Sequence, residues 1–343
     1  MEVVELRAGT YLPKNSFDFS DKTQIETVAV IEANLLGKGR FGQVFKGTLK
    51  TASAEGSLTV AVKTMNSNAD SCYFRSLLAE LKMLSRVGRH EHIVNLIGAC
   101  TGELKLGKLY IVVEFCAHGS IDNYIKARKG LFQNMIVGDQ IIVTNPVCHE
   151  HYQNFYESLT TLDILKWACQ TSSGMDYLAN KKIIHGDIAA RNILLTESMC
   201  IKIADFGFSR YLYNDLNYIK KQEDPLPWRW MAPESLCSRE FSSKTDVWSY
   251  AVTLWEFFTL CEMPFREFNW SVEFVDLIKS GHRLRRPVLC TSGIYELMCS
   301  CWQVDPKCRP QFRDICEYFS QIINAAKPES PYDYMAHNTL YYV

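Results

Sequence analysis

Residues 185–192 read His-Gly-Asp-Ile-Ala-Ala-Arg-Asn, and residues 205–207 read Asp-Phe-Gly. This stretch combines two carboxylates, Asp187 and Asp205, with the amide of Asn192, which lies thirteen residues before Asp205. Phosphoryl transfer requires such a set. One carboxylate takes the proton of the attacking hydroxyl, while an amide and a second carboxylate hold magnesium against the phosphates of ATP. We therefore expect these three side chains on neighbouring loops.

The composition is that of a folded, soluble protein. The chain has 343 residues, of which 47% are hydrophobic and 22% charged, and its formal net charge is -1 at pH 7. One hydrophobic core rarely extends over this length, so a bilobed domain or two packed subdomains is expected. The small net charge gives no bulk attraction to nucleic acid or anionic lipid, and we expect no nucleic-acid partner.

The chain contains 13 cysteines, an odd number without a regular spacing. This favours free thiols in a reducing compartment over secreted disulfides, and therefore a cytoplasmic location. Two groups could hold a metal, Cys148 with His149 and His151, and Cys299 with Cys301. Neither group has a second pair at zinc spacing, so loop and core residues are the better interpretation.

No stretch approaches the ~18 apolar residues of a membrane-spanning helix. The start of the chain, Met-Glu-Val-Val-Glu, also lacks the basic and apolar regions of a secretory signal. We expect no membrane span in this chain. The alternative that it is the inner part of a larger receptor stays open.

A glycine-rich segment lies near the amino terminus. Residues 36–44 read Leu-Gly-Lys-Gly-Arg-Phe-Gly-Gln-Val, and an apolar run ends at Lys63. The pattern predicts strand, glycine hairpin and strand, with backbone amides free to approach phosphate oxygens and with Val44 and Ala61 facing an adenine ring. A dinucleotide-binding unit would place a helix directly after the third glycine, whereas a strand pattern follows Gly42. The phosphate-covering hairpin is therefore favoured.

Residues 77–84 have apolar side chains at helical spacing, and Glu80 lies among them. An ion pair between Glu80 and Lys63 would fix the lysine against the α- and β-phosphates. Taken alone, Glu80 would be better explained as a solvated helix residue, and only the surrounding motifs favour the ion pair.

The middle of the chain predicts a connection and an insert. Residues 110–116 form a short apolar run of buried-strand type, which could offer its backbone to adenine, and residues 121–128 have helical spacing. Periodicity fades over 129–161, which indicates a surface insert or a partly disordered loop. A helix is then predicted over 162–179.

A polar, tyrosine-rich stretch follows the Asp-Phe-Gly motif and ends at residues 226–234. A polar segment between a metal ligand and a fixed anchor is typical of a regulatory loop. Farther on, Glu234 and Arg309 are candidates for a buried ion pair, because buried charges are retained only when matched.

Together these motifs, in order from Leu36 to Phe312, resemble the eukaryotic protein kinase domain. The resemblance implies an α+β, bilobed fold with a small β-rich amino-terminal lobe that contains one main helix, and a larger helical carboxy-terminal lobe. The expected boundaries are 31–113 for the first lobe, 114–119 for a hinge and 120–325 for the second lobe, with the insert at about 129–161.

The sequence Ala-Ala-Arg at residues 189–191 and Leu-Pro at 226–227 resemble the tyrosine-specific branch. Residues 95–101, the insert and Asn217-Tyr218 are similar to the split-kinase receptors for platelet-derived, vascular endothelial and fibroblast growth factors and stem-cell factor. The resemblance implies an ATP- and magnesium-dependent enzyme, with manganese as a substitute, that phosphorylates protein tyrosines, including its own.

The resemblance assigns roles to individual residues. The catalytic group is Lys63, Glu80, Asp187 and Arg191, and the metal ligands are Asn192 and Asp205. Nucleotide contacts are expected from Lys63 and from Leu36, Gly37, Lys38, Gly39, Arg40, Phe41, Gly42, Gln43, Val44, Ala61, Val113, Glu114, Cys116 and Leu194. Among these, Val113 is the gatekeeper, Glu114 and Cys116 are hinge contacts, and Leu194 lies beneath the adenine. Phosphorylation is expected mainly at Tyr218, and also at Tyr211, Tyr213 and Tyr334.

Two residues depart from the family pattern. Gly186 stands where the family usually has an arginine that grips the phosphorylated activation loop, so the link between phosphorylation and order should be weaker. Trp228 replaces a small aliphatic residue, which changes the shape of the peptide pocket beside it. We expect intact chemistry and altered regulation.

The two ends of the chain differ from its centre. Residues 1–30 resemble the segment between membrane and kinase in these receptors, which implies the cytoplasmic part of a plasma-membrane receptor. Residues 326–343 are polar and tyrosine-rich, so they could dock phosphotyrosine-binding adaptor modules or be an inert tail. Phosphorylation between two copies would require a homodimer.

The alternatives to a tyrosine kinase are a nucleotide-binding scaffold and an oxidoreductase. A pseudokinase-type nucleotide-binding scaffold would keep the fold without transfer, and only Gly186 favours it. A nicotinamide-dependent oxidoreductase fails because the glycine-to-helix junction is missing.

Overall fold

The computed structural model describes residues 3–7, 25–39, 42–51, 57–65, 71–101, 104–142, 158–211 and 226–326. The chain divides into two compact units. Unit 1 comprises Met1–Ile121 and Tyr177–Leu226, and unit 2 comprises Asp122–Asp176 and Pro227–Val343.

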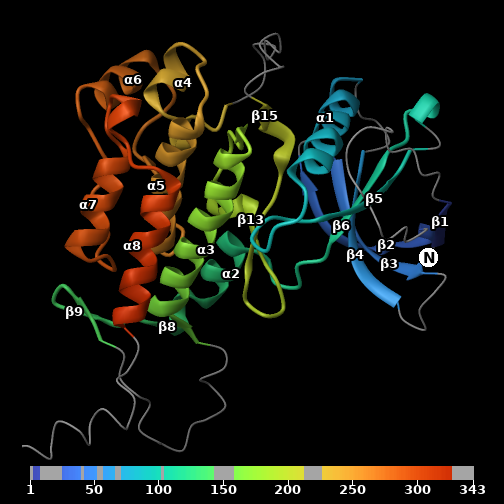
Figure 1. The fold of residues 1–343 in the computed structure, drawn as a ribbon, viewed down its shortest axis with the longest axis horizontal. Coiled ribbons are helices and arrows are strands. Elements are labelled where there is room, and N and C mark those ends of the chain that lie inside the picture. The colour runs from blue at the N-terminus through green and yellow to red at the C-terminus, as the bar shows by residue number, and fades with distance from the viewer. Residues whose placement is uncertain are drawn as a thin grey trace, which may run out of the picture. The chain divides into compact units, whose positions relative to one another are not determined.

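Unit 1 contains an antiparallel sheet of six strands in the order β1-β2-β3-β4-β6-β5 (Figure 1). The strands are β1 Val3–Arg7, β2 Ile25–Gly39, β3 Gly42–Thr51, β4 Ser57–Thr64, β5 Leu96–Cys100 and β6 Tyr110–Glu114. Apolar side chains on alternate positions meet in a buried cluster that includes Val60, Val62 and Val112. The predicted hairpin at the glycines is present, since Gly39 pairs with Gly42.

Helix α1, Ser71–Val87, is the one long helix among the described residues before Ile121. Its buried side chains Leu77, Leu84 and Val87 recur at helical spacing, and Glu80 is buried on the same helix. The helix predicted around residues 77–84 is therefore confirmed, and it extends farther in both directions.

The remaining elements of unit 1 are short, and most of them lie within residues 183–211. They are η1 Leu104–Leu106, β7 Gly119–Ser120, β12 Ile183–Ile184, η4 Ala190–Asn192, β13 Ile193–Leu195, β14 Ile201–Ile203, η5 Phe206–Phe208 and β15 Arg210–Tyr211. Strands β14, β13 and β7 form one small sheet, and β12 pairs with β15. These hairpins arrange the polar residues of the HGDIAARN and DFG motifs.

Apart from these elements, the described part of the chain is mainly helical. Its helices are α2 Ile121–Arg128, α3 Thr161–Asn180, α4 Pro233–Cys237, α5 Ser243–Phe258, α6 Val272–Lys279, α7 Ser292–Cys301 and α8 Phe312–Ala325. Short 3-10 turns are η2 Lys129–Leu131, η6 Trp228–Trp230 and η7 Pro306–Cys308. The helices predicted over 121–128 and 162–179 are confirmed. So is the expected combination of a β-rich amino-terminal lobe with one main helix and a helical carboxy-terminal lobe.

Helix α5 is the central element of unit 2 (Figure 1). Ser242 and Thr245 form a capping box at its start, which satisfies the first free amides of the helix. Almost every later side chain is buried, including polar ones such as Asp246 and Thr253. Because α5 is buried on all sides, it forms the core against which its neighbours pack.

The described parts of the insert, residues 129–142 and 158–161, contain more secondary structure than the fading periodicity predicts. Strand β8, Phe132–Gln133, pairs in parallel with β11, Leu159–Thr160, and β9, Ile136–Val137, pairs with β10, Gln140–Ile141. Asp139 accepts hydrogen bonds from the Ser292 amide at 2.6 Å, from the Ser292 hydroxyl and from Arg286 at 2.9 Å. These tertiary contacts hold the hairpin formed by β9 and β10, and no local sequence pattern predicts them. Residues 143–157 lie outside the described part, and with them Cys148, His149 and His151.

Within the described ranges, no helix has the length and hydropathy to cross a membrane. In the same ranges no three His, Cys, Asp or Glu side chains form a group that could hold a metal ion, and Cys299 and Cys301 belong to no such group. The boundaries predicted for the lobes, the hinge and the two terminal segments stay predictions.

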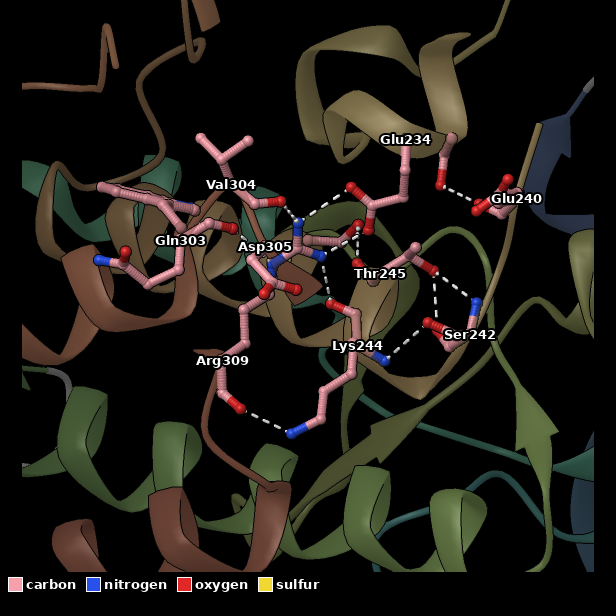
Figure 2. Close-up of polar contacts among 12 residues, drawn as sticks. Glu234, Glu240, Ser242, Lys244, Thr245, Gln303, Val304, Asp305 and Arg309 are labelled. Carbon is pink, nitrogen blue, oxygen red and sulfur yellow. Dashed lines mark hydrogen bonds and ion pairs between the residues drawn. The ribbon is translucent and has the colours of Figure 1, made fainter. Parts of the chain in front are cut away.

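The predicted ion pair between Glu234 and Arg309 is formed (Figure 2). The guanidinium donates to the two Glu234 carboxylate oxygens at 2.6 and 2.9 Å, and further to the carbonyls of Lys244 and Gln303 at 2.9 and 2.8 Å. The Lys244 ammonium in turn donates to the carbonyl of Arg309 at 2.6 Å. The Arg309 side chain is fully buried, so these bonds replace all of its hydration.

Replacing Arg309 by Met should lower the free energy of unfolding by about 3 to 5 kcal/mol, because it leaves Glu234 and several carbonyls without their partner. Urea unfolding measures this change. The matched control is Arg313→Met, which breaks an exposed pair with Glu317 and should cost less than about 1 kcal/mol. Similar small losses for both variants would contradict the structural role assigned to Arg309.

Candidate active site

A short hairpin brings Asn192 and Asp205 to the same end of a sheet. Strand β13 starts directly after Asn192, and β14 ends two residues before Asp205, with Ile193 paired to Ile203. The Ala204 amide donates to the Asn192 carbonyl at 2.9 Å, which extends the pairing by one bond. The thirteen-residue spacing between Asn192 and Asp205 therefore corresponds to strand β13, a turn and the antiparallel strand β14.

Asp187 is oriented by two neighbours from its own loop. The Asn192 side-chain amide donates to the Asp187 carbonyl at 2.7 Å and to its carboxylate at 2.8 Å. Arg191 donates to the other carboxylate oxygen at 2.5 Å. Because the NH₂ group of Asn192 is used in these bonds, its side-chain oxygen is the atom that Asn192 can offer to a cation.

His185 joins this loop to the segment before Asp205. Its Nδ1 accepts from the Asp187 amide at 3.2 Å, so Nε2 carries the proton and donates to the Ala204 carbonyl at 3.1 Å. Complete burial lowers the pKa of His185 to about 4, which keeps the ring neutral. The ring also packs against Phe206, with centroids 5.2 Å apart. Sequence reasoning gave His185 no role, although its position two residues before Asp187 was a signal for one.

Asp205 has a left-handed backbone, with φ 63° and ψ 75°. Few residues other than glycine adopt this conformation, and it is typically stored at functional sites. A side-chain oxygen of Asp205 accepts from the Gly207 amide at 3.3 Å, and the same carboxylate lies 3.5 Å from the Lys63 ammonium. The turn therefore directs this carboxylate toward Lys63.

Lys63 lies between two carboxylates. Its ammonium is 2.7 and 2.6 Å from the Glu80 oxygens, in addition to the contact with Asp205. Burial lowers the pKa of Lys63, but Glu80 and Asp205 more than offset this, so the pKa is raised. Burial raises the pKa of Asp205, and Lys63 outweighs that effect, so this pKa is lowered. Lys63 and Asp205 are consequently both charged at neutral pH.

Asp187 has the opposite electrostatic character. Burial raises its pKa to about 6, the negative charge of Asp205 adds to the rise, and Arg191 and Asn192 act against it. Two neighbouring aspartates thus have pKa values displaced in opposite directions. This is the arrangement expected when one binds a cation and the other transfers a proton.

The glycine hairpin between β2 and β3 approaches β4 closely. Lys38 pairs with Gln43, and Gly39 with Gly42. A Cβ atom on Gly42 would lie 2.1 Å from the Thr64 carbonyl oxygen, and the φ of Gly42 is +146°. Only glycine fits there.

The other residues predicted for this hairpin differ in how far they are described. Gln43 and Val44 are half-buried in β3, and Leu36 is exposed on β2 near Gly37. For Lys38 the backbone alone is described, and Arg40 and Phe41 lie outside the described residues.

Ala61 and Val113 are partners on β4 and β6, the strands predicted to border the adenine. The next residue, Glu114, has its carboxylate engaged elsewhere. It accepts from the Asn95 amide at 2.6 Å, from the Asn95 side chain at 2.8 Å and pairs with Lys202 at 3.0 Å. With its side chain held in this way, Glu114 would contact a nucleotide through its backbone. Sequence reasoning missed Lys202, although a lysine between two isoleucines of a strand was a signal.

The chain after Glu114 is fixed by backbone hydrogen bonds. Gly119 donates to the Cys116 carbonyl at 3.2 Å, and His118 donates to the Leu195 carbonyl at 3.1 Å. Leu194 pairs with Ser120 of β7 and with Lys202 of β14. The predicted contacts of Cys116 and Leu194 with adenine stay predictions.

The start of the tyrosine-rich segment is attached to the strand before the HGDIAARN motif. Ile183 pairs with Tyr211 in the β12–β15 ladder, and the Ser209 hydroxyl donates to the His185 carbonyl at 3.1 Å. Gly186 has φ +79°, and a Cβ atom there would lie 3.2 Å from the Phe208 carbonyl oxygen. Tyr213, Tyr218 and Tyr334 lie outside the described residues, and only the backbone of Tyr211 is described.

Trp228, the second departure from the family pattern, lies in an aromatic cluster of unit 2. Its ring packs edge-on against Phe274 at 4.8 Å and near Trp270 at 6.0 Å, with the Arg229 guanidinium 4.1 Å over its face. Arg229 also donates to the Phe268 carbonyl at 2.9 Å. The large side chain is accommodated by packing against these rings and the Arg229 guanidinium.

Comparisons with known proteins agree with this geometry. A family model described as protein tyrosine and serine/threonine kinase matches residues 30–319. Vascular endothelial growth factor receptor 1 of Homo sapiens is 34% identical over 348 residues, which cover 89% of this chain and 26% of that receptor. Vascular endothelial growth factor receptor 3 of Mus musculus is 35% identical over 329 residues, covering 84% and 24%. The chain spans about a quarter of the length of these relatives.

Proposed function

We propose that this chain, which belongs to the protein tyrosine and serine/threonine kinase family, transfers the γ-phosphate of ATP to tyrosine hydroxyls of protein substrates. The family resemblance predicted from the motifs is confirmed, including its similarity to split-kinase receptors. The observation that carries the proposal is the gathering of Lys63, Glu80 and Asp205 with Asp187 and Asn192 in one unit.

The proposed mechanism assigns one task to each group. The Lys63 ammonium, fixed by Glu80, binds oxygens of the α- and β-phosphates. Asp187, held by Arg191 and Asn192, accepts the proton of the substrate hydroxyl as the oxygen attacks the γ-phosphate.

The residues present also fit a divalent metal ion. Asn192 and Asp205 would hold magnesium or manganese, because the amide oxygen and the carboxylate are the hard ligands that such ions prefer. A bound ion would neutralise charge on the phosphates.

The pseudokinase alternative has little support. A scaffold that binds nucleotide without transfer has no need of a carboxylate positioned by two donors, as Asp187 is. The kinase-family match and the similarity to receptors likewise give no indication of a lost activity.

The relatives support a wider biological setting. Because the similar proteins are named growth-factor receptors, we propose that the chain is the cytoplasmic part of a plasma-membrane receptor. Two copies would phosphorylate each other as a homodimer, and the resulting phosphotyrosines would bind adaptor modules.

Replacing Asp187 by Asn should lower kcat for a glutamate-tyrosine copolymer by about 10²- to 10⁴-fold, since the general base is lost. The Kd for ATP should stay nearly unchanged. Transfer of labelled phosphate and calorimetric titration of the nucleotide measure the two effects. Asp276→Asn, at an exposed position of α6, serves as control and should keep full activity. Full activity of Asp187→Asn would contradict the role of Asp187 as the base, and no transfer by the parent protein would favour the pseudokinase.

The dependence of kcat/KM on pH should show an acid limb near the Asp187 pKa of about 6. The carboxylate is the active form, so activity is present above this pH and is lost as the pH falls through it. Arg191 favours the charged carboxylate, so Arg191→Gln should move the limb to higher pH. The Kd for ATP is measured at each pH, because phosphates titrate in this region too. An unmoved limb would contradict Asp187 as the base.

Gly186 leads to a proposal on regulation that rests on this function. The usual arginine is replaced, while the start of the tyrosine-rich segment is already attached through the β12–β15 ladder and Ser209. These contacts need no phosphate group. The opening part of the segment would therefore keep its position whether or not Tyr218 is phosphorylated.

Replacing Tyr218 by Phe should accordingly change kcat by less than about threefold, which is under ~1 kcal/mol in the activation free energy. Initial rates of the purified protein, with autophosphorylated sites identified by mass spectrometry, provide the measurement. Tyr213→Phe is the control for loss of a neighbouring hydroxyl. A large loss confined to Tyr218→Phe would show that phosphorylation still controls the active site.

A further inference from the structure

Two cysteines of unit 2 face each other between helices α3 and α8. The sulfur atoms of Cys169 and Cys316 lie 3.9 Å apart. Each sulfur also lies near the main chain of the other residue, with Cys169 Sγ 3.8 Å from the Cys316 carbonyl and Cys316 Sγ 3.9 Å from the Cys169 carbonyl. A disulfide needs an S–S distance of about 2.05 Å. Rotation of the two side chains and a small helix shift would close the gap.

Hydroxyl-bearing side chains lie near the two thiols. Ser320, one turn beyond Cys316, places its hydroxyl 3.4 Å from Cys169 Sγ. Ser172 donates to the Cys169 carbonyl at 2.8 Å, and Tyr250 donates to the Ala168 carbonyl at 2.8 Å. Of these hydroxyl groups, that of Ser320 lies beside the Cys169 sulfur, where it stabilises a thiolate.

The two thiols differ in acidity. The hydrogen bond with Cys316 lowers the pKa of Cys169 to about 6, in spite of partial burial. The same hydrogen bond raises the pKa of Cys316. Cys169 is therefore the more acidic thiol of the two, and the thiolate is the form that reacts with oxidants.

Solvent access distinguishes this pair from the buried cysteines of unit 2. Cys169 and Cys316 are half-buried, whereas Cys290 and Cys301 are buried and burial raises the pKa of each to about 12. Cys308 is exposed. Two thiols that only fill space in the core would need neither a serine hydroxyl beside the sulfur nor a difference in acidity between them.

We propose that Cys169 and Cys316 are a site of oxidative modification that closes to a disulfide when the protein meets a hydroperoxide. The Cys169 thiolate attacks the peroxide oxygen, which breaks the O–O bond and yields a sulfenic acid and, after protonation, water or an alcohol. The Cys316 sulfur then attacks the Cys169 sulfur and forms the S–S bond, and hydroxide leaves and takes up the Cys316 proton as water. Two thiols and one hydrogen peroxide thus give one disulfide and two waters.

The disulfide would connect residues 147 positions apart in the sequence. Closing so long a loop removes much entropy from the unfolded chain, so the oxidised protein should melt ~5 °C or more above the reduced one.

Peptide mapping of the full chain tests the proposal. The protein is treated with hydrogen peroxide, its remaining thiols are alkylated under denaturing conditions, and it is digested with trypsin. Trypsin releases Cys169 in residues 167–181 and Cys316 in residues 314–343, and neither peptide contains another cysteine. The expected product joins these two peptides with a mass two hydrogen atoms below their sum, and a reducing agent separates them.

Two variants define the order of the steps. Cys316→Ser should stop at a Cys169 sulfenic acid that dimedone traps, and Cys169→Ser should give neither the trapped acid nor the rise in melting temperature. Cys308→Ser is the control and should behave like the parent protein. If Cys169 and Cys316 both remain open to alkylation at a peroxide concentration that oxidises Cys308, the proposal is overturned. These measurements do not use phosphoryl transfer, so they stand or fall independently of the proposed function.

Discussion

The arrangement of the candidate active site depends on one buried ammonium group. Lys63 lies between Glu80 and Asp205, and an unpaired charge in such a position would cost several kcal/mol. Strand β4, helix α1 and the turn after β14 must therefore keep their positions together. The left-handed backbone of Asp205 and the hydrogen bonds of His185 are consistent with this requirement, because both fix that turn.

Much of the fold and of the candidate site could be predicted from the sequence, wherever a local pattern of residues specifies the structure. Helical spacing located α1, α2 and α3, and the glycine spacing followed by a strand pattern located the β2–β3 hairpin. The pairing of Lys63 with Glu80 could also be predicted, because the motif around each residue indicates its role. In these cases the residues that matter are near one another in sequence, or belong to motifs whose chemistry requires them together.

Other features could not be predicted because they join distant residues without a local pattern. Glu114 meets Lys202, and Asp139 meets Ser292, across separations of 88 and 153 residues. The lysine between two isoleucines signals a buried charge but does not identify its partner, and an aspartate in a turn resembles an ordinary surface residue. The neutral state of His185 likewise depends on its burial and on two backbone groups, which no sequence pattern specifies.

The parallel pairing of β8 with β11 has a consequence for how this chain can change during evolution. Phe132 pairs with Leu159, and Gln133 with Thr160, so the two ends of the intervening segment lie side by side. Adding residues between these strands then costs only the slowly growing entropy of a longer closed loop, about 0.6 kcal/mol for each doubling. Lineages could lengthen or shorten this segment, and give it new recognition sequences, with little effect on the helices beneath it.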